Sequence, residues 1–357
     1  MNILVTGASG FIGCHVVVSL LARGHRVTAV ARDPSKAAAS PWYGRATFIA
    51  ADIHDASTVK RLQPATFDAI MHLAWPGLPN YTALTHIEQT LPAECAFLKD
   101  LVQAGVTQLL VAGTCFEYGI QHGCMDELTI PAPVTPYAVA KNTLRSYLEA
   151  LKKIHPFRFQ WARLFYMHGT GQNPGSLLAQ LNAAIDRGDT VFNMSGGEQI
   201  RDFLPVENIA AHLVSLAEHP SFDGIVNVCS GTPVSVRRLV EAHIAARGAS
   251  IRLNPGHHPY PDYEPMAFWG DDTKLRQLLT ESQRKDHRTK VLSGNKCNDM
   301  ALRFGADLAG LIEPTRRRNR ATSTTWRLKT GQRWPEDEMP ECNGNFLTDP
   351  NPVTERL

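Results

Sequence analysis

Short apolar runs alternate with amphipathic stretches along the first half of the chain. The runs predict buried strands over residues 3–5, 26–31, 46–51, 67–74 and 108–113. Between and after them, apolar residues recur at helical spacing, most clearly over residues 15–22, 82–104 and 136–153. Strands that alternate with helices predict an α/β fold built on a doubly wound parallel sheet with right-handed crossovers.

The periodic pattern fades after about residue 280. The last segment, residues 281–357, has few periodic apolar positions and carries the run R-R-R-N-R at 316–320. Only Met300–Ile312 has the pattern of a helix. Low apolar content and clustered charge predict a disordered tail or a poorly packed appendage.

Composition changes this picture little. The 357 residues are 43% apolar and 20% charged, which is typical of a soluble globular protein. A formal charge of +2 gives no reason to expect nucleic acid or an anionic membrane as a partner. Seven cysteines without a C-x-x-C pair favour reduced thiols over a disulfide framework or a metal site. The start of the chain lacks a basic leader, so we expect a cytoplasmic protein.

The turn after the first strand has candidate chemistry. It reads T-G-A-S-G-F-I-G over Thr6–Gly13, and it is followed by an amphipathic helix that Gly24 closes. Glycines at 7, 10 and 13 let the backbone turn sharply, and they let a diphosphate approach the amides at the helix N-terminus. The sequence therefore predicts a Rossmann-type dinucleotide site contacted by Gly7, Gly10, Phe11, Ile12 and Gly13.

The end of the second strand selects the cofactor. An acidic residue there binds a ribose diol, whereas an arginine holds a 2′-phosphate. The strand ends Ala31-Arg32-Asp33, so alanine takes the first position and Arg32 follows. This order favours NADP(H) over NAD(H), and Asp33 leaves NAD(H) open.

Further candidate residues stand where the other strands end. They are Asp52 and Ile53 after the third strand, Leu73 and Ala74 in the fourth, and Thr114 after the fifth. Ligands of doubly wound sheets bind outside the carboxyl ends of the strands. We therefore expect these residues to border the cofactor.

In combination these motifs resemble the extended short-chain dehydrogenase/reductase family of nucleotide-sugar epimerases, dehydratases and reductases. The resemblance covers residues 1 to 280 and is carried by T-G-A-S-G-F-I-G, M-H-L-A, G-T-C-F-E-Y-G, Y-A-V-A-K and R-D-F-L-P-V. It implies a nucleotide-sugar substrate. It also implies a cofactor domain over 1–165, a smaller substrate lobe over 166–280, and a homodimer formed through the helices at 82–104 and 136–153.

The resemblance assigns the catalytic roles. Tyr137 is the proton donor or acceptor, and Thr114 shares the reacting oxygen. Lys141 binds the cofactor ribose, and it lies one helical turn from Tyr137. A free phenol has a pKa near 10, and a neighbouring ammonium lowers that value.

The residues after Thr114 limit which of the family's reactions the chain could catalyse. Cys115-Phe116 follow it, where the dehydratases of the family have Asp-Glu. The resemblance is greatest to reductases of 4-keto-6-deoxy sugar nucleotides, with Tyr166 and Arg201 at the substrate. A 4-epimerase stays open, although such enzymes usually have asparagine at the place of Tyr166. A cofactor-sensing protein without turnover is a third possibility, but it has no need of a proton relay.

Trp75 stands where the family usually has a smaller residue, and the sequence does not decide between a pocket role and a core role.

Overall fold

The computed structural model describes residues 1–219 and 221–281 of the chain. Its centre is a seven-stranded parallel sheet in the order β11-β7-β5-β4-β1-β2-β3. The strands are β1 (Asn2–Thr6), β2 (Arg26–Ala31), β3 (Thr47–Ala50), β4 (Ala69–His72), β5 (Gln108–Thr114), β7 (Arg158–Leu164) and β11 (Gly224–Val228). The predicted doubly wound Rossmann-type sheet is confirmed. The expected helix at 300–312 and the arginine run at 316–320 lie outside the described residues.

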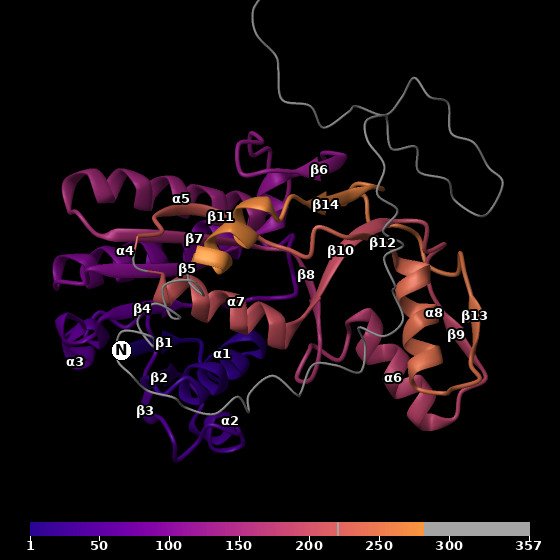
Figure 1. Cartoon of the computed structure of the whole chain (residues 1–357), viewed down its shortest axis with the longest axis horizontal. Helices are drawn as coiled ribbons and strands as arrows, with labels where there is room; N and C mark the ends of the chain where they lie inside the picture. Colours follow the sequence, from indigo (N-terminus) through magenta and orange to yellow (C-terminus); the bar gives the residue numbers. More distant parts are fainter. Residues whose placement is uncertain (220, 282–357) are drawn as a thin grey trace, which may run out of the picture. The chain divides into compact units, whose positions relative to one another are not determined.

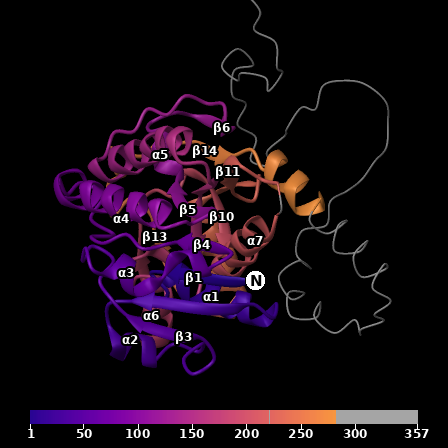
Figure 2. The ribbon, with the colours of Figure 1, turned by 90° about the vertical axis from the view of Figure 1, so that its left-hand side faces the viewer.

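The central strands are mostly apolar on both faces, and helices cover both sides of the sheet. In β1, Ile3 and Val5 point into one core cluster and Leu4 into another, as the two-residue repeat of a strand requires. The first cluster lies under α1 (Phe11–Ala22) and α7 (Val206–Glu218). The second lies under α3 (Thr58–Leu62), α4 (Leu91–Gln103) and α5 (Pro136–Ile154), and α4 and α5 run side by side (Figures 1 and 2).

The helix expected over 82–104 differs from its prediction. The structure has a π-helical segment, η2 (His86–Thr90), followed by α4 from Leu91. Pro92 has no backbone N–H, so a regular α-helical hydrogen bond cannot form there and the preceding turn is wider. The remaining short elements before β5 are α2 (Pro34–Ala38) and η1 (Pro64–Thr66).

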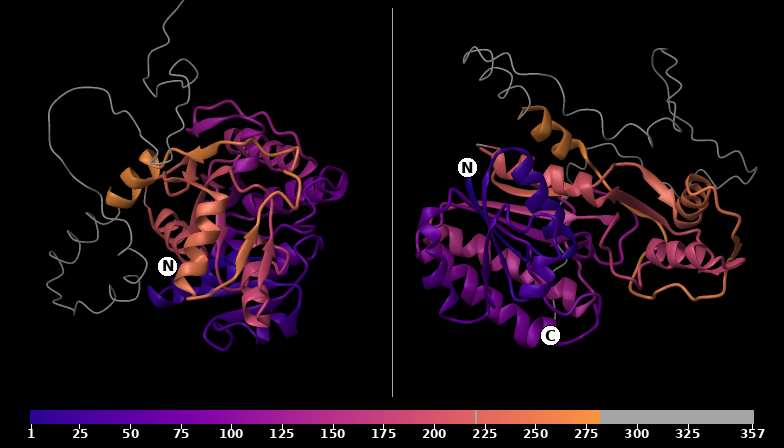
Figure 3. Two further views of the ribbon diagram at one scale, coloured as in Figure 1. Left: turned by 90° about the vertical axis from the view of Figure 1, so that its right-hand side faces the viewer. Right: turned by 90° about the horizontal axis from the view of Figure 1, so that it is seen from below.

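A smaller group of elements follows β7 in the chain and has a core of its own. Its strands are β8 (Tyr166–His168), β9 (Val191–Asn193), β10 (Ile200–Pro205), β12 (Pro233–Ser235) and β13 (Arg252–Asn254). Helices α6 (Leu177–Arg187) and α8 (Val236–Ala246) pack through Leu181 and Val240, apart from the large sheet (Figures 1 and 3). The chain leaves this group through α7 and β11 to rejoin the sheet. The division of the chain at residue 165 stays a prediction.

One further strand pair joins the two groups. Strand β6 (Gly123–Met125) pairs with β14 (Phe268–Gly270), so the loop after β5 is tied to the last described strand. No helix of residues 1–219 and 221–281 is long and apolar enough to cross a membrane.

Candidate active site

The glycine turn lies between β1 and α1 at the carboxyl edge of the sheet. Gly7 has φ of 68°, and a Cβ added at Gly13 would meet the Gly7 carbonyl oxygen at 2.1 Å. Only glycine therefore fits at both positions. Gly10 caps α1 without a side-chain hydrogen bond, which leaves the first amides of the helix free for an anion. These features fit the diphosphate of a nicotinamide dinucleotide.

The end of β2 has one acidic residue, Asp33, and its carboxylate is engaged in a helix cap. Ala31 is buried and Arg32 is exposed. The Asp33 carboxylate caps α2, where it accepts hydrogen bonds from the backbone N–H groups of Ser35 and Lys36 at 2.9 and 3.1 Å. Asp33 is thus used by the local fold, and Arg32 remains as the charged side chain at this strand end.

A buried charged cluster lies next to Leu73 and Ala74. The Glu94 side chain is 0% exposed, and its Oε1 lies 3.1 Å from His54 Nε2. Its Oε2 lies 2.9 Å from His72 Nε2, without the alignment of a good hydrogen bond. His72 also contacts Thr6 Oγ1 at 3.0 Å.

This cluster supports the loop that would face the cofactor. Thr6 Oγ1 accepts weak hydrogen bonds from the N–H groups of Leu73 and Ala74, at 3.3 and 3.4 Å. Burial alone would raise the pKa of Glu94, but His72 and His54 more than offset it and hold the pKa at about 2. The hydrogen bond with Glu94 in turn raises the pKa of His54. Asp52 Oδ1 accepts a hydrogen bond from the backbone N–H of His54 at 3.0 Å, and the Ile53 side chain is buried.

The structure brings Thr114, Tyr137 and Lys141 together. Thr114 ends β5, and Tyr137 and Lys141 stand in the first turns of α5. Thr135 caps that helix by accepting the Ala138 N–H at 3.2 Å, and Pro136 takes the first position, where a missing N–H costs nothing. The lysine Nζ donates to the Ala112 carbonyl oxygen at 2.9 Å.

Burial dominates the acidity of both groups. It raises the pKa of Tyr137 well above its ordinary value, as does neighbouring Tyr81, whereas a hydrogen bond with Thr114 lowers it. Burial lowers the pKa of Lys141 to about 8, and the carboxylates of Glu94 and Glu117 limit that fall. Without ligand the phenol is therefore neutral and holds its proton, as a general acid must.

Glu117 fixes the loop that carries Thr114. Its Oε1 accepts the Thr114 N–H and the Trp161 Nε1–H, each at 2.9 Å, and its Oε2 accepts the Arg163 Nε–H at 2.9 Å. All four residues are buried. Glu117 lies within the motif G-T-C-F-E-Y-G, but no sequence pattern predicted that it holds this loop.

Aromatic rings form a wall beside Tyr137. The ring centroids of Tyr81, His86 and Trp75 lie 5.5, 5.5 and 5.9 Å from that of Tyr137. The Tyr81 carbonyl oxygen accepts the Tyr137 N–H at 3.1 Å, and burial raises the pKa of Tyr81 to about 12. No pattern in the sequence indicated Tyr81 or His86, because their contacts exist only in the folded chain.

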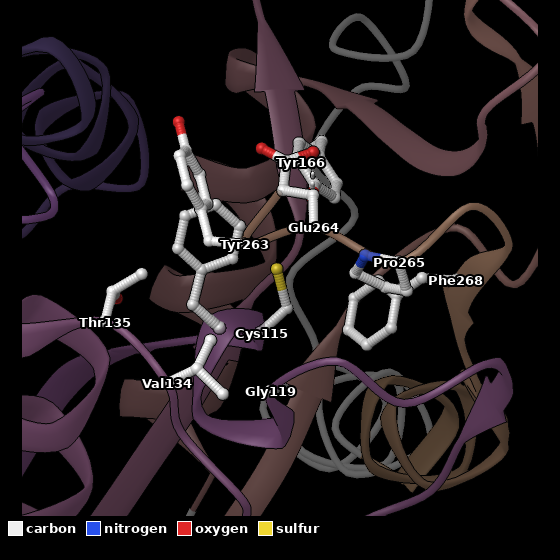
Figure 4. A pocket seen from close by; sticks show the side chains of 10 residues that line it. Cys115, Gly119, Val134, Thr135, Tyr166, Tyr263, Glu264, Pro265 and Phe268 are labelled. Atoms are coloured by element: carbon white, nitrogen blue, oxygen red, sulfur yellow. Dashed lines mark hydrogen bonds between the residues drawn. The ribbon is translucent and has the colours of Figure 1, made fainter. Parts of the chain in front are cut away.

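A small pocket continues from this wall toward β14. Figure 4 shows the Cys115 thiol pointing into it between Tyr263 and Pro265. The lining comes from four separate segments: Cys115, Phe116, Gly119, Val134, Thr135, Tyr166, Tyr263, Glu264, Pro265 and Phe268. Burial raises the pKa of Cys115 well above its ordinary value, so the thiol is a small apolar group here.

Arg201 lies beside this pocket rather than at the surface. It is 1% exposed, and its Nη2 donates to Glu264 Oε2 at 2.9 Å. The Tyr166 hydroxyl donates to the same oxygen at 3.1 Å. Asp202 is not the partner of Arg201, since it accepts from the N–H groups of Ser230 and Gly231 instead. The guanidinium is therefore buried beside the pocket with Glu264 as its counter-ion, and its contact with a substrate stays a prediction.

The fold and these residues define a dinucleotide-dependent enzyme of the short-chain dehydrogenase/reductase class. Residues 3–229 match the model of the NAD dependent epimerase/dehydratase family. The chain belongs to that family of NAD-dependent enzymes.

Two curated relatives show the range of the family. A dTDP-6-deoxy-L-talose 4-dehydrogenase (NAD(+)) from Aggregatibacter actinomycetemcomitans is 30% identical, with 76% of this chain and 99% of the relative covered. UDP-arabinose 4-epimerase 1 from Arabidopsis thaliana is 28% identical, with 78% and 74% covered. Both are named for chemistry at C4 of a sugar nucleotide.

Solved structures agree with the fold. MoeE5 in complex with UDP-glucuronic acid and NAD is 27% identical to the chain, with a TM-score of 0.67. The match covers 80% of this chain and 100% of MoeE5.

Proposed function

We propose that the chain reduces a nucleoside-diphosphate-linked 4-keto-6-deoxyhexose at C4, with NAD(P)H as the hydride source. The observation that carries the proposal is the set Thr114, Tyr137 and Lys141 at the carboxyl edge of the sheet. The phenol of Tyr137 is buried and protonated, next to the Thr114 hydroxyl. A reduction of a ketone needs such an acid at the forming alkoxide.

The residues after Thr114 favour reduction over elimination of water. Cys115 and Phe116 line the pocket in front of Thr114, and the raised pKa of Cys115 makes it a poor acid or base at neutral pH. Apolar side chains suit a sugar with a methyl group at C6. The relative named as a dTDP-6-deoxy-L-talose 4-dehydrogenase catalyses, by its name, the same redox step in the oxidative direction.

Each residue has a defined task in this reaction. When bound, the nicotinamide ring supplies hydride to C4. Tyr137 gives its proton to the C4 oxygen while Thr114 donates a hydrogen bond to it, and Lys141 holds the cofactor ribose. The cofactor would contact Gly7, Gly10, Phe11, Ile12, Gly13, Asp52, Ile53, Leu73 and Ala74 along the same edge of the sheet. Tyr166 and Arg201 would face the substrate, the latter toward its diphosphate.

We further propose NADP(H) as the preferred cofactor. Asp33 is engaged in capping α2, Ala31 has no polar side chain, and Arg32 is free to meet a 2′-phosphate. The curated dehydrogenase is named for NAD(+), so the preference separates this chain from that relative. We also expect a cytoplasmic homodimer joined through α4 and α5, which sedimentation at micromolar concentration would test.

A 4-epimerase is the second candidate, because several relatives are named as 4-epimerases and the same three residues suffice for that reaction. An assay with NADPH, NADH and a panel of 4-keto-6-deoxy and 4-hydroxy sugar nucleotides separates the two. Stoichiometric oxidation of the cofactor with a 4-keto sugar supports the reductase. Conversion of a 4-hydroxy sugar to its C4 epimer without net cofactor use supports the epimerase and excludes our first proposal.

A further inference from the structure

Trp75 covers the ammonium of Lys141. The residue follows Ala74 after β4, and its side chain is half-buried. The Lys141 Nζ lies 4.0 Å from the centre of the indole ring, within the range of a cation–π contact. The lysine is 2% exposed, so the indole takes the place of water on that side of the charge.

His86 fixes the orientation of this indole. The Trp75 Nε1–H donates to His86 Nδ1 at 3.1 Å, so that ring nitrogen has no proton of its own. Nε2 then carries the proton and donates to the Asn80 carbonyl oxygen at 2.7 Å. A Cβ added at Gly77 would meet His86 Cε1 at 3.0 Å, so the loop closes tightly around a neutral imidazole.

The same two rings contact the second catalytic group. Trp75 and His86 stack on each other with centroids 6.2 Å apart, and each packs edge-on against the Tyr137 ring. A shift of the indole would therefore move the phenol and the ammonium together.

The remaining neighbours of Lys141 define its electrostatic setting. The Ala112 carbonyl on β5 accepts its hydrogen bond, Glu94 on α4 and Glu117 on η3 (Cys115–Tyr118) attract its charge, and Tyr137 precedes it on α5. Neither carboxylate is paired directly with the ammonium among the described contacts. The Ala112 carbonyl oxygen and the indole face of Trp75 are therefore the close contacts of the ammonium among the described residues.

We propose that Trp75, oriented by His86, is a positioning residue that holds the Lys141 ammonium beside Tyr137. The inference rests on the proposed function for the roles of Lys141 and Tyr137. It answers the question that the sequence left open, since Trp75 belongs to the catalytic wall and not simply to the core. When an aliphatic side chain replaces the indole, the ammonium stays buried but loses the cation–π attraction, so the lysine loses its proton at lower pH.

The first test uses the full chain without ligand and needs no substrate. Because the pKa of Lys141 is about 8, the tryptophan fluorescence of the wild type should show a transition near that pH. Lys141→Met should remove the transition, whereas Trp42→Phe, which replaces a buried tryptophan outside the site, should keep it. An unchanged transition in Lys141→Met would overturn the contact between Trp75 and Lys141, whatever reaction the enzyme performs.

The second test measures the pH profile of kcat/KM on a substrate that the wild type converts. Trp75→Leu should lower kcat by about tenfold and move the basic limb about one pH unit lower, with a smaller change in the KM of the sugar nucleotide. Trp75→Phe keeps a ring face and should recover most of the profile, and His86→Phe should resemble Trp75→Leu in weaker form. If Trp75→Leu is folded by circular dichroism and has the pH profile of the wild type, Trp75 is a packing residue and the proposal is wrong. If the chain converts none of the sugar nucleotides in the panel, the proposed function fails. The fluorescence result still decides whether Trp75 contacts Lys141.

Discussion

The two sides of the candidate active site are built in different ways. Most of the side assigned to the dinucleotide comes from one continuous βαβ unit, with Gly7, Gly10 and Gly13 in a single turn and Arg32 at the end of β2. The aromatic wall and the pocket beside it are assembled from residues far apart in the chain, among them Trp75, Phe116 and Tyr263. The first side follows from local backbone requirements. The second depends on tertiary packing, and it is the side to which the proposed function assigns the substrate.

Charge follows the same division. Beneath the dinucleotide side lies the ion cluster of His54, Glu94 and His72, which involves no ring of the wall. Around the wall, the formal charges of Arg201 and Glu264 neutralise each other, and aromatic rings supply most of the surface. Changes on the first side should therefore act mainly on cofactor binding and stability, and changes on the second mainly on turnover. Glu94 links the two, because its carboxylate also attracts the charge of Lys141.

The largest expected loss of activity follows a change at Tyr137, beside the aromatic wall. Tyr137→Phe removes the acid with almost no change in volume, so kcat should fall by ~10²–10⁴ while the Kd of the cofactor stays nearly unchanged. Steady-state kinetics and fluorescence titration with NADPH would measure the two quantities. Near wild-type turnover on every substrate of the parent would show that another group supplies the proton.

Beneath the dinucleotide side, Glu94→Gln should reduce stability. Loss of one partner from a buried ion cluster typically costs ~3–5 kcal/mol of unfolding free energy. Urea denaturation monitored by circular dichroism would measure it, with Glu88→Gln on the exposed face of η2 as the control, expected within about 0.5 kcal/mol of the wild type.

The pH dependence of that difference has a definite direction. The folded pKa of Glu94, about 2, lies below its ordinary 4.5, so its contribution is present above pH 4.5 and is lost as the pH falls toward 2. The raised pKa of His54 contributes below pH 6.5, and this part is lost as the pH rises through the folded value. The difference in unfolding free energy between the wild type and Glu94→Gln should be largest between pH 4.5 and the folded pKa of His54. A difference that grows toward pH 3 would contradict this role of Glu94.

A smaller effect is expected at the dinucleotide side itself. Arg32→Ala should weaken NADPH binding by about tenfold to a hundredfold, which is the loss of one charge-assisted contact, and should leave NADH binding nearly unchanged. Calorimetric titration with both cofactors would measure the ratio. Equal losses for the two would place Arg32 outside the 2′-phosphate site and would remove the reason for preferring NADP(H).

Prediction from the sequence succeeded where local rules dominate. The strand at Arg26–Ala31 has the expected bounds, the parallel sheet expected from alternating elements is present, and the structure brings Thr114, Tyr137 and Lys141 together. The order of the strands and the strand β7 were not predicted. Glycine spacing and an N-terminal proline in α5 are local signals, and they identify positions without knowledge of the rest of the chain.

Residues whose roles depend on distant partners were missed. Glu264 neutralises Arg201 across 63 positions of sequence, and His54 reaches Glu94 across 40. His86 fixes Trp75 through a hydrogen bond that no periodic pattern encodes. The π-helical turn before Leu91 was missed as well, since the effect of Pro92 on the preceding turn depends on how the surrounding helices hold it.

The most direct test of the account follows the hydride. Cofactor deuterated at C4 of the nicotinamide ring, in its NADPH and NADH forms, is incubated with a 4-keto-6-deoxy sugar nucleotide, and the product is analysed by mass spectrometry and NMR. We expect one deuterium at C4 of the sugar, one oxidised cofactor per product, and loss of both in Tyr137→Phe. Formation of a C4 epimer from a 4-hydroxy sugar nucleotide, with no deuterium taken from added cofactor and no net oxidation, would contradict the account.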